Sequence, residues 1–396
     1  MWRKMREWIK RHTPKYFISV YQRVRYLWIV LLFHIFRLFR IQNNRVVFCN
    51  VWGYGDNAKY IAEEMVLRKT KAELIFITNY PKLACAPKEI KVVQTNSIAA
   101  IFALATAKVW VDSNRKEGYI RKRKGQFYIQ TWHGGVPLKK IEGDCEEYLG
   151  EVYIQRAKWD SAMTDLYLSN GGFCTDMYRR AFWYTGEILE CGTPRMDQLL
   201  KQKTVVKNQI RKQYGLSEKE RIALYAPTYR NQKQAEYYLK DLSKITDILS
   251  NRFQVPFVLF VRLHPLCAEQ SETISYGKTV KNVSAARDFY ELLEASDILI
   301  TDYSNTMFEA ALAEKYVFLY INDKKVYEQQ RGLYFKIEEL PFPYAVTEED
   351  LRKEIINFNE EKYKRKIEQF LKELRIKETG KASQIATDRI LEILNF

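Results

Sequence analysis

The chain has 396 residues, of which 47% are hydrophobic and 14% aromatic, and this composition excludes an intrinsically disordered protein. The length predicts two or three domains, each able to bury its own core. A net charge of +16 and a pI of about 9.3 indicate a polyanionic partner, such as nucleic acid, an anionic membrane surface or a phosphorylated substrate. The six cysteines form no C-x-x-C pair and have no histidine at metal-ligand spacing. We therefore expect reduced, mostly buried thiols in a cytosolic protein, without a zinc site or a disulfide framework. We expect no cofactor, and the sequence leaves a divalent metal requirement open.

Residues 1–44 differ in composition from the rest of the chain. The first forty residues carry ten Lys and Arg against one acid, Glu7, with aromatic residues interleaved. The apolar run from Tyr26 to Phe36 is too short to cross a bilayer, and no small-residue cleavage site follows it. We expect a basic amphipathic helical segment that lies on an anionic membrane surface. The alternative is a basic helix packed on the protein's own core.

From residue 45 onward, short apolar strands alternate with helical patterns. The expected strands are 45–49, 74–78, 92–93, 109–111 and 127–130. The expected helices are 57–66 and 98–106. This alternation predicts a parallel sheet with helices on both faces, and ligands bind such sheets at the carboxyl ends of the strands. His133 follows the last of these strands.

The strand pattern restarts after a charged stretch at 201–220. The expected strands of this second part are 222–225, 255–262 and 298–300, each followed directly by a polar motif. We predict two Rossmann-like domains, 45–200 and 201–396, that face each other across a cleft. The last fifty residues read as charged helices without a motif of their own.

Two of the four histidines lie in compact clusters, Gln130–Gly135 and Arg262–Pro265. Imidazole can take or give a proton near neutral pH, and glycine beside it lets a substrate approach the backbone. Both clusters are therefore candidate catalytic sites, centred on His133 and His264. The alternative for each is a structural histidine.

A further candidate site lies at the turn from the strand at 298–300 into the next helix. Ser304 or Asn305 is expected to cap that helix, assisted by Glu309. Free N–H groups at a helix start form a seat for phosphate, although an ordinary cap would look the same. Arg230 and Arg262 also follow strands and could hold a pyrophosphate or simply be solvated.

Asp323, Tyr327, Arg331 and Gly332 lie farther along the chain. They either close around a nucleotide or structure a loop. The chain has no P-loop, no protein-kinase motif set, no G-x-S-x-G elbow and no cluster of metal ligands.

The order of these motifs resembles the CDP-glycerol glycerophosphotransferase family, of the teichoic acid primase and polymerase type. The matching stretches are 53–57, QTWHGGVPLKKIEGD at 130–144, GTPRMD at 192–197, APTYR at 226–230, RLHP at 262–265, DILITDYSNTMFEAA at 297–311, and Asp323, Tyr327, Arg331, Gly332 and Tyr334. The resemblance covers residues 50 to about 335. Two positions depart from the family pattern: Asn305 stands where a second Ser is common, and Leu340-Pro341-Phe342-Pro343 replaces a Pro-Gly-Pro segment.

The resemblance implies a GT-B-like fold and transfer of an alditol phosphate from CDP-glycerol or CDP-ribitol, with release of CMP. The acceptor would be a saccharide linked to undecaprenyl pyrophosphate, at the cytoplasmic face of the membrane. His133 would be the general base and His264 a second catalytic histidine beside the donor phosphates. The implied donor-binding residues are Arg230, Arg262, Thr301, Ser304, Asn305, Asp323 and Arg331. The implied acceptor-side residues are Asp56, Asn57, Trp132, Gly134 and Lys139.

Two other functions fit parts of the sequence. A nucleotide-sugar glycosyltransferase acting on a lipid-linked acceptor would share the two-domain fold, but it offers no role for His133 together with His264. A nucleic-acid-binding protein would account for the net charge, but the densest basic cluster is aromatic-rich and amphipathic, so we expect no nucleic acid partner. The sequence leaves open the donor alditol, a primase or a polymerase activity, the exact acceptor and the oligomeric state.

Overall fold

The computed structural model describes residues 15–201, 204–229, 238–263, 276–286, 288–324 and 332–395. They contain a seven-stranded sheet within residues 42–190 and a six-stranded sheet within 221–345. The chain divides into two compact units, and each unit is built from segments that are separated in the sequence. The first unit is Met1–Trp132, Trp159–Tyr167 and Thr387–Phe396, and the second is His133–Lys158 and Leu168–Ala386. The predicted domain boundaries at residues 44 and 200 stay a prediction.

The seven-stranded sheet has the strand order β3-β2-β1-β4-β5-β6-β7, in which the chain starts in the middle and moves outward on both sides. Its strands are β1 (Gln42–Cys49), β2 (Glu73–Thr78), β3 (Ile90–Gln94), β4 (Ala107–Asp112), β5 (Phe127–Gln130), β6 (Leu166–Ser169) and β7 (Glu187–Glu190). Strands β1 to β6 pair in parallel. Continuous apolar runs such as Val46-Val47-Phe48 are fully buried, because helices cover both faces of a parallel sheet.

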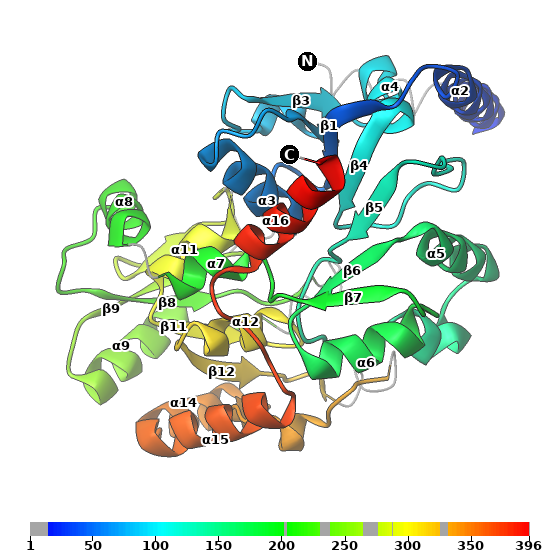
Figure 1. Ribbon diagram of the computed structural model, residues 1–396. Coiled ribbons are helices and arrows are strands. Elements are labelled where there is room, and N and C mark those ends of the chain that lie inside the picture. The colour runs from blue at the N-terminus through cyan, green and yellow to red at the C-terminus, as the bar shows by residue number, and fades with distance from the viewer. Residues whose placement is uncertain are drawn as a thin grey trace. The chain divides into compact units, whose positions relative to one another are not determined.

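Helices connect these strands and continue into the second unit. They are α2 (Lys15–Phe36), α3 (Asp56–Leu67), α4 (Ile98–Thr106), α5 (Glu151–Met163), α6 (Gly172–Ala181) and α7 (Met196–Leu200), with 3-10 turns at Pro81–Leu83 and Glu142–Tyr148. The hydroxyl of Ser97 caps α4 by accepting the N–H of Ala100 at 3.2 Å. Helix α2 lies beside α4 (Figure 1), and Ile29 and Phe33 of α2 are buried in the same core cluster as α4.

The six-stranded sheet repeats the same winding, with the order β10-β9-β8-β11-β12-β13. Its strands are β8 (Arg221–Tyr225), β9 (Phe257–Val261), β10 (Val280–Asn282), β11 (Ile298–Thr301), β12 (Tyr316–Tyr320) and β13 (Tyr344–Ala345). All of its strand pairs are parallel. This is the strand order of a Rossmann-like sheet, in which polar loops gather at the carboxyl ends of the strands.

The helices of the second half are amphipathic, and several begin at a side-chain cap. They are α8 (Thr204–Tyr214), α9 (Leu242–Phe253), α11 (Phe289–Ala295), α12 (Thr306–Leu312), α14 (Glu348–Ile356), α15 (Glu360–Glu373) and α16 (Ala382–Leu394), with a 3-10 turn at Ile337–Glu339. Asp241, Asp288, Thr347 and Asn359 cap α9, α11, α14 and α15 through their side-chain oxygens. In Figure 1, α14 and α15 lie beside β12.

The predicted fold class, α/β with two Rossmann-like parallel sheets, is confirmed. Each strand predicted from the sequence is present, with ends that shift by up to three residues, and the helix at 98–106 has the predicted bounds. Among the described helices, none combines the length and the apolar character that a bilayer span requires.

Candidate active site

The turn before His133 is held by a side chain from the start of α3. The amide nitrogen of Asn57 donates to the carbonyl oxygens of Thr131 at 3.3 Å and Trp132 at 3.1 Å. Trp132 has a φ of 53°, which places a non-glycine residue in the left-handed region and turns the chain sharply. The buried Asn57 amide therefore positions this turn, in addition to any role toward the acceptor. Asp56 supports Asn57 by accepting its backbone N–H at 2.8 Å.

A buried charged residue supports the side chain of Trp132. The Arg115 guanidinium lies 5.4 Å from the Trp132 ring. Arg115 donates to Asp160 Oδ2 at 3.0 Å and to the Tyr167 hydroxyl at 2.7 Å. Trp132 was predicted to face the acceptor, but only 7% of it is exposed, so its ring serves mainly as packing behind the turn. Nothing in the sequence marked Arg115, because an arginine in a loop reads as solvated.

His133 is exposed, whereas the residues on both sides of it are buried. The two glycines that follow differ in the space around them. A Cβ on Gly134 would meet Arg195 Nη2 at 3.6 Å and Asn305 Nδ2 at 3.8 Å, which are ordinary contacts. A Cβ on Gly135 would lie 2.5 Å from Asn170 Nδ2, so only glycine fits there without displacing Asn170.

The loop after His133 is joined to the turn at the end of β11. The backbone N–H of Leu138 donates to Asn305 Oδ1 at 2.9 Å. Asn305 occupies the N-cap position of α12, but its side chain makes no cap hydrogen bond. The expected cap was Ser304 or Asn305. Asn305 does not act as the cap, because its amide oxygen accepts the N–H from the histidine loop, whereas the Ser304 hydroxyl accepts the N–H of Thr306 at 3.4 Å. Two motifs far apart in the sequence meet here within the second compact unit.

The same loop also pairs with the segment that contains Gly332. Lys139 forms an antiparallel bridge with Leu333, and the N–H of Lys140 donates to the Gly332 carbonyl at 2.9 Å. The Tyr334 hydroxyl donates to Asp144 Oδ2 at 2.6 Å. Lys139 was predicted on the acceptor side, and the structure places it, half-buried, in this pairing. Gly332 thus takes part in a structured loop, one of the two interpretations given for it, and Tyr334 adds a further contact to the same loop.

A pocket of about 420 Å³ lies at the carboxyl ends of β8, β9 and β11. Its polar lining includes Arg262, Ser304 and Thr306. The Arg262 guanidinium lies 5.2 Å from the Phe289 ring and donates to the Ala286 carbonyl at 3.3 Å. Burial lowers the pKa of Arg262, but a guanidinium remains charged at neutral pH. This pocket therefore combines a fixed cation with hydroxyl groups, which suits an anionic ligand.

Thr301 does not line this pocket. It is fully buried, and its hydroxyl donates to the Ala226 carbonyl at 2.7 Å. Asp302 next to it accepts the N–H and the hydroxyl of Thr228 at 2.9 and 3.0 Å. Thr301 and Asp302 thus fix the loop at the end of β8. The implied role of Thr301 in donor binding stays a prediction. Ser304 lines the pocket, and its hydroxyl lies 2.8 Å from that of Thr306.

A buried ion pair stands beside Gly134. Arg195 donates through Nε to Glu309 Oε1 at 3.0 Å, and its Nη2 contacts the same oxygen. The Tyr290 hydroxyl donates to Glu309 Oε2 at 2.7 Å, and the Arg195 guanidinium lies 5.0 Å from the Tyr290 ring. The expectation that Glu309 assists the cap of α12 was wrong, since its carboxylate is committed to Arg195 and Tyr290. The role of Arg195 was not predicted, although the GTPRMD motif contained it.

The remaining predicted site residues are either buried or lie outside the described residues. Asp323 is buried, with 6% of it exposed, in the turn after β12. Arg230, His264 and Arg331 fall outside the described residues, so their predicted roles stay predictions.

A Rossmann-like sheet with a cationic pocket at its strand ends, joined to an exposed histidine by hydrogen-bonded loops, defines a phosphate-handling class of enzyme site. The chain belongs to the CDP-glycerol:poly(glycerophosphate) glycerophosphotransferase family, which matches residues 31–392. The resemblance found in the sequence motifs is thereby confirmed.

The relatives of the chain include teichoic acid polymerases and primases. It is 30% identical over 356 residues to the teichoic acid poly(glycerol phosphate) polymerase of Staphylococcus epidermidis, covering 85% of this chain and 48% of the relative. It is 29% identical over 246 residues to the teichoic acid glycerol-phosphate primase of Bacillus subtilis, covering 60% of this chain and 61% of the relative. The chain thus spans about half the length of the polymerase.

A solved structure of the wall teichoic acid polymerase TagF, a histidine-to-asparagine variant soaked with CDPG, shares this fold. It superposes with a TM-score of 0.82 at 27% identity, covering 96% of this chain and 97% of that chain. The similarity therefore extends over both sheets.

Proposed function

We propose that this chain transfers glycerol phosphate, or another alditol phosphate, from a CDP-activated donor to a membrane lipid-linked saccharide, with release of CMP. The observation that carries the proposal is the hydrogen bond from the Leu138 N–H to Asn305 Oδ1 at 2.9 Å. It ties the loop of the candidate base, His133, to the turn that lines the cationic pocket. Family membership and the TagF structure with CDPG support CDP-glycerol as the donor.

In the proposed reaction, an acceptor hydroxyl attacks the phosphorus that carries the glycerol. A new O–P bond forms as the bond from that phosphorus to the bridging oxygen breaks, and CMP leaves with the bonding electrons. His133 takes the proton of the attacking hydroxyl, because an imidazole can accept a proton near neutral pH. The reaction needs a nucleophile in line with the leaving group and positive charge at the phosphate oxygens.

The cationic pocket would hold the pyrophosphate of the donor. Arg262 supplies a charge whose orientation is set by Phe289 and Ala286, so little side-chain entropy is lost on binding. The hydroxyls of Ser304 and Thr306 add hydrogen-bond donors at its rim. Its volume of about 420 Å³ falls within the usual range for small-molecule sites. Arg230 and His264 would add to this set by family pattern.

Helix α2 would hold the enzyme on the cytoplasmic face of the membrane. One side of α2 packs on the core through Ile29 and Phe33, while aromatic residues on other sides, including Tyr21 and Trp28, are exposed. Exposed arginines lie between them, which suits an interface between acyl chains and anionic headgroups. The enzyme and a lipid-linked acceptor would then diffuse in the plane of the same membrane surface.

The test measures CMP release from CDP-glycerol and from CDP-ribitol, with a lipid-linked disaccharide acceptor in anionic vesicles. The wild type is expected to release CMP with one donor, and His133→Ala to lower kcat by about a hundredfold or more, the usual contribution of a general base. Tyr148→Ala is the control, because Tyr148 is exposed and lies outside both α2 and the cationic pocket. No turnover with either donor would favour a nucleotide-sugar transferase, and equal loss in both variants would remove His133 from the chemistry.

A further inference from the structure

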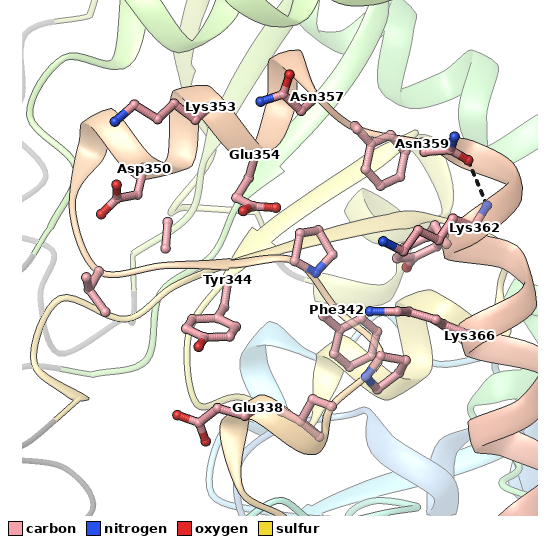
Figure 2. Close-up of a pocket in the computed structure, with 17 residues that line it drawn as sticks. Glu338, Phe342, Tyr344, Asp350, Lys353, Glu354, Asn357, Asn359, Lys362 and Lys366 are labelled. Carbon is pink, nitrogen blue, oxygen red and sulfur yellow. Dashed lines mark hydrogen bonds between the residues drawn. The ribbon is translucent and has the colours of Figure 1, made fainter.

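A second and larger pocket, of about 690 Å³, lies at the edge of the six-stranded sheet. One wall is the segment 340–346, which contains the edge strand β13 and the Leu340-Pro341-Phe342-Pro343 stretch that departs from the family pattern. The other wall is formed by α14 and the first turns of α15 (Figure 2). It shares no lining residue with the cationic pocket at the strand ends, so it is a separate feature of the second unit.

Two lysines on successive turns of α15 face this pocket. Lys362 and Lys366 both line it, and Figure 2 shows their side chains extending from α15 in the same direction, that of Lys366 toward Phe342. Like charges four residues apart on a helix repel each other. Within the described part of the chain, neither lysine forms an ion pair that would offset this repulsion. The arrangement is therefore suited to an anion that contacts both ammonium groups.

The acidic residues of the pocket differ in what they contact. Glu338 is paired with Lys324, and Asp350 accepts the hydroxyl of Thr347 at 2.6 Å. Glu354 forms no ion pair among the described residues, and Figure 2 shows its carboxylate directed toward the segment of Tyr344. A carboxylate repels a ligand that carries only negative charge, but it accepts hydrogen bonds from hydroxyl groups. The pocket thus presents two ammonium groups and a carboxylate that can accept a hydrogen bond from a ligand hydroxyl.

We propose that this pocket binds the polyol-phosphate chain itself, with phosphates at Lys362 and Lys366 and a free hydroxyl at Glu354. A polyol-phosphate polymer alternates an anion with short carbon segments that bear hydroxyls, which is the pattern that these side chains complement. Phe342 and the adjoining prolines form an apolar floor for the carbon segments. The inference rests on the proposed function and on its repetition at one acceptor, because only repeated transfers make such a chain. The pocket would retain the growing polymer after each transfer.

The first measurement is direct binding without any donor. A fluorescently labelled oligo(glycerol phosphate) of several units is titrated into the full chain, and anisotropy gives the Kd. Lys362→Gln combined with Lys366→Gln is expected to raise the Kd about five- to tenfold, since each exposed charge contact contributes up to about 1 kcal/mol. Arg365→Gln combined with Lys372→Gln is the matched control, because it removes the same charge from exposed positions of α15 outside the pocket. This control should leave the Kd within about twofold.

The second measurement separates this inference from the proposed function. The Lys362/Lys366 variant should release CMP at the wild-type rate with a single-unit acceptor but yield shorter products. Equal weakening in both double variants, or no weakening in either, would refute the pocket even if CMP release is normal. Equally tight binding of inorganic polyphosphate would also refute it, because a ligand without hydroxyls should be repelled by Glu354. Absence of CMP release in the wild type would instead refute the proposed function.

Discussion

Asn305 Oδ1 accepts the backbone N–H of Leu138 at 2.9 Å, although 167 residues separate the two positions in the chain. This bond joins the end of the histidine loop to the turn that begins α12. A Cβ on Gly134 would lie 3.8 Å from Asn305 Nδ2, so Asn305 lies close to the loop at Gly134 as well as at Leu138. Asn305, one of the two positions at which the resemblance implied a departure from the family pattern, therefore anchors the histidine loop.

Replacing Asn305 should weaken both stability and turnover. Asn305→Ala leaves the part-buried N–H of Leu138 without its acceptor, and we expect a loss of about 1–2 kcal/mol in the free energy of unfolding. Asn305→Asp keeps an acceptor oxygen and should lose less. Urea denaturation of the two variants measures the difference. Equal stabilities of the alanine and aspartate variants would contradict the anchoring role.

The effects of replacing Arg195 and Glu309 on the free energy of unfolding should not be additive. Only 8% and 4% of the two side chains are exposed, so removing one partner leaves a buried charge. We expect Glu309→Leu or Arg195→Met to cost about 3 kcal/mol each, and the double variant to cost less than their sum. A double-mutant cycle in urea measures this coupling. If the double variant regains stability but not CMP release, the pair positions the site and does more than hold the fold.

The two glycines after His133 should respond differently to alanine. Gly134→Ala adds a methyl at ordinary contact distance from Arg195 and Asn305, so we expect almost no change in stability. Gly135→Ala places its methyl 2.5 Å from Asn170 Nδ2 and should cost about 1–3 kcal/mol through overpacking. Thermal unfolding of both variants provides the comparison. A Gly134→Ala protein that unfolds as easily as Gly135→Ala would show that the loop tolerates no side chain at all.

Glu378 should make stability depend on pH near neutrality. Its carboxylate accepts the N–H of Thr193 at 2.9 Å and the hydroxyl at 2.6 Å, and burial raises the pKa of Glu378 to about 7. Because the folded pKa lies above the unfolded value near 4.5, the folded state binds more protons between these two pH values. This contribution is complete below pH 4.5 and is lost as pH rises through about 7, a change of about 3 kcal/mol.

Replacement of Glu378 by glutamine should remove this dependence. Glutamine can accept the Thr193 N–H and donate to the Thr193 hydroxyl, so the contact survives without a titrating group. The free energy of unfolding is measured by urea denaturation at pH 5 and pH 8. The glutamine variant should lose less stability than the wild type between these values. The same loss in both proteins would assign the pH dependence to other groups.

Exposed aromatic residues of α2 should determine vesicle binding. Tyr21 and Trp28 are 68% and 58% exposed. Replacing both by serine should lower the partition coefficient onto anionic vesicles at least tenfold, since each buried aromatic side chain contributes about 1.5–3 kcal/mol. Tyr80→Ser with Tyr148→Ser is the control, because these exposed tyrosines lie outside α2. Cosedimentation measures the bound fraction. Equal loss in both pairs would contradict α2 as the membrane contact.

Local features of the sequence predicted the elements well where the apolar runs were long. The strand at 127–130 and the helix at 98–106 have the predicted bounds, because hydrophobic period and the Ser97 cap act within a few residues. Several strands, among them β7, β12 and β13, were not predicted. The motifs that follow strands were predicted to form the site, and Arg262 and Ser304 do share one pocket.

The hydrogen-bond partners of individual polar side chains depend on tertiary packing. The sequence pattern placed Glu309 near the cap of α12, but in the structure its carboxylate accepts from Arg195. Helical period and apolar strand runs depend on neighbours in the chain, so the amino-acid sequence by itself predicted the two Rossmann-like sheets. Contacts such as Arg195 with Glu309, 114 residues apart, depend on which buried polar atoms find partners once both elements are packed, and only the tertiary structure decides them.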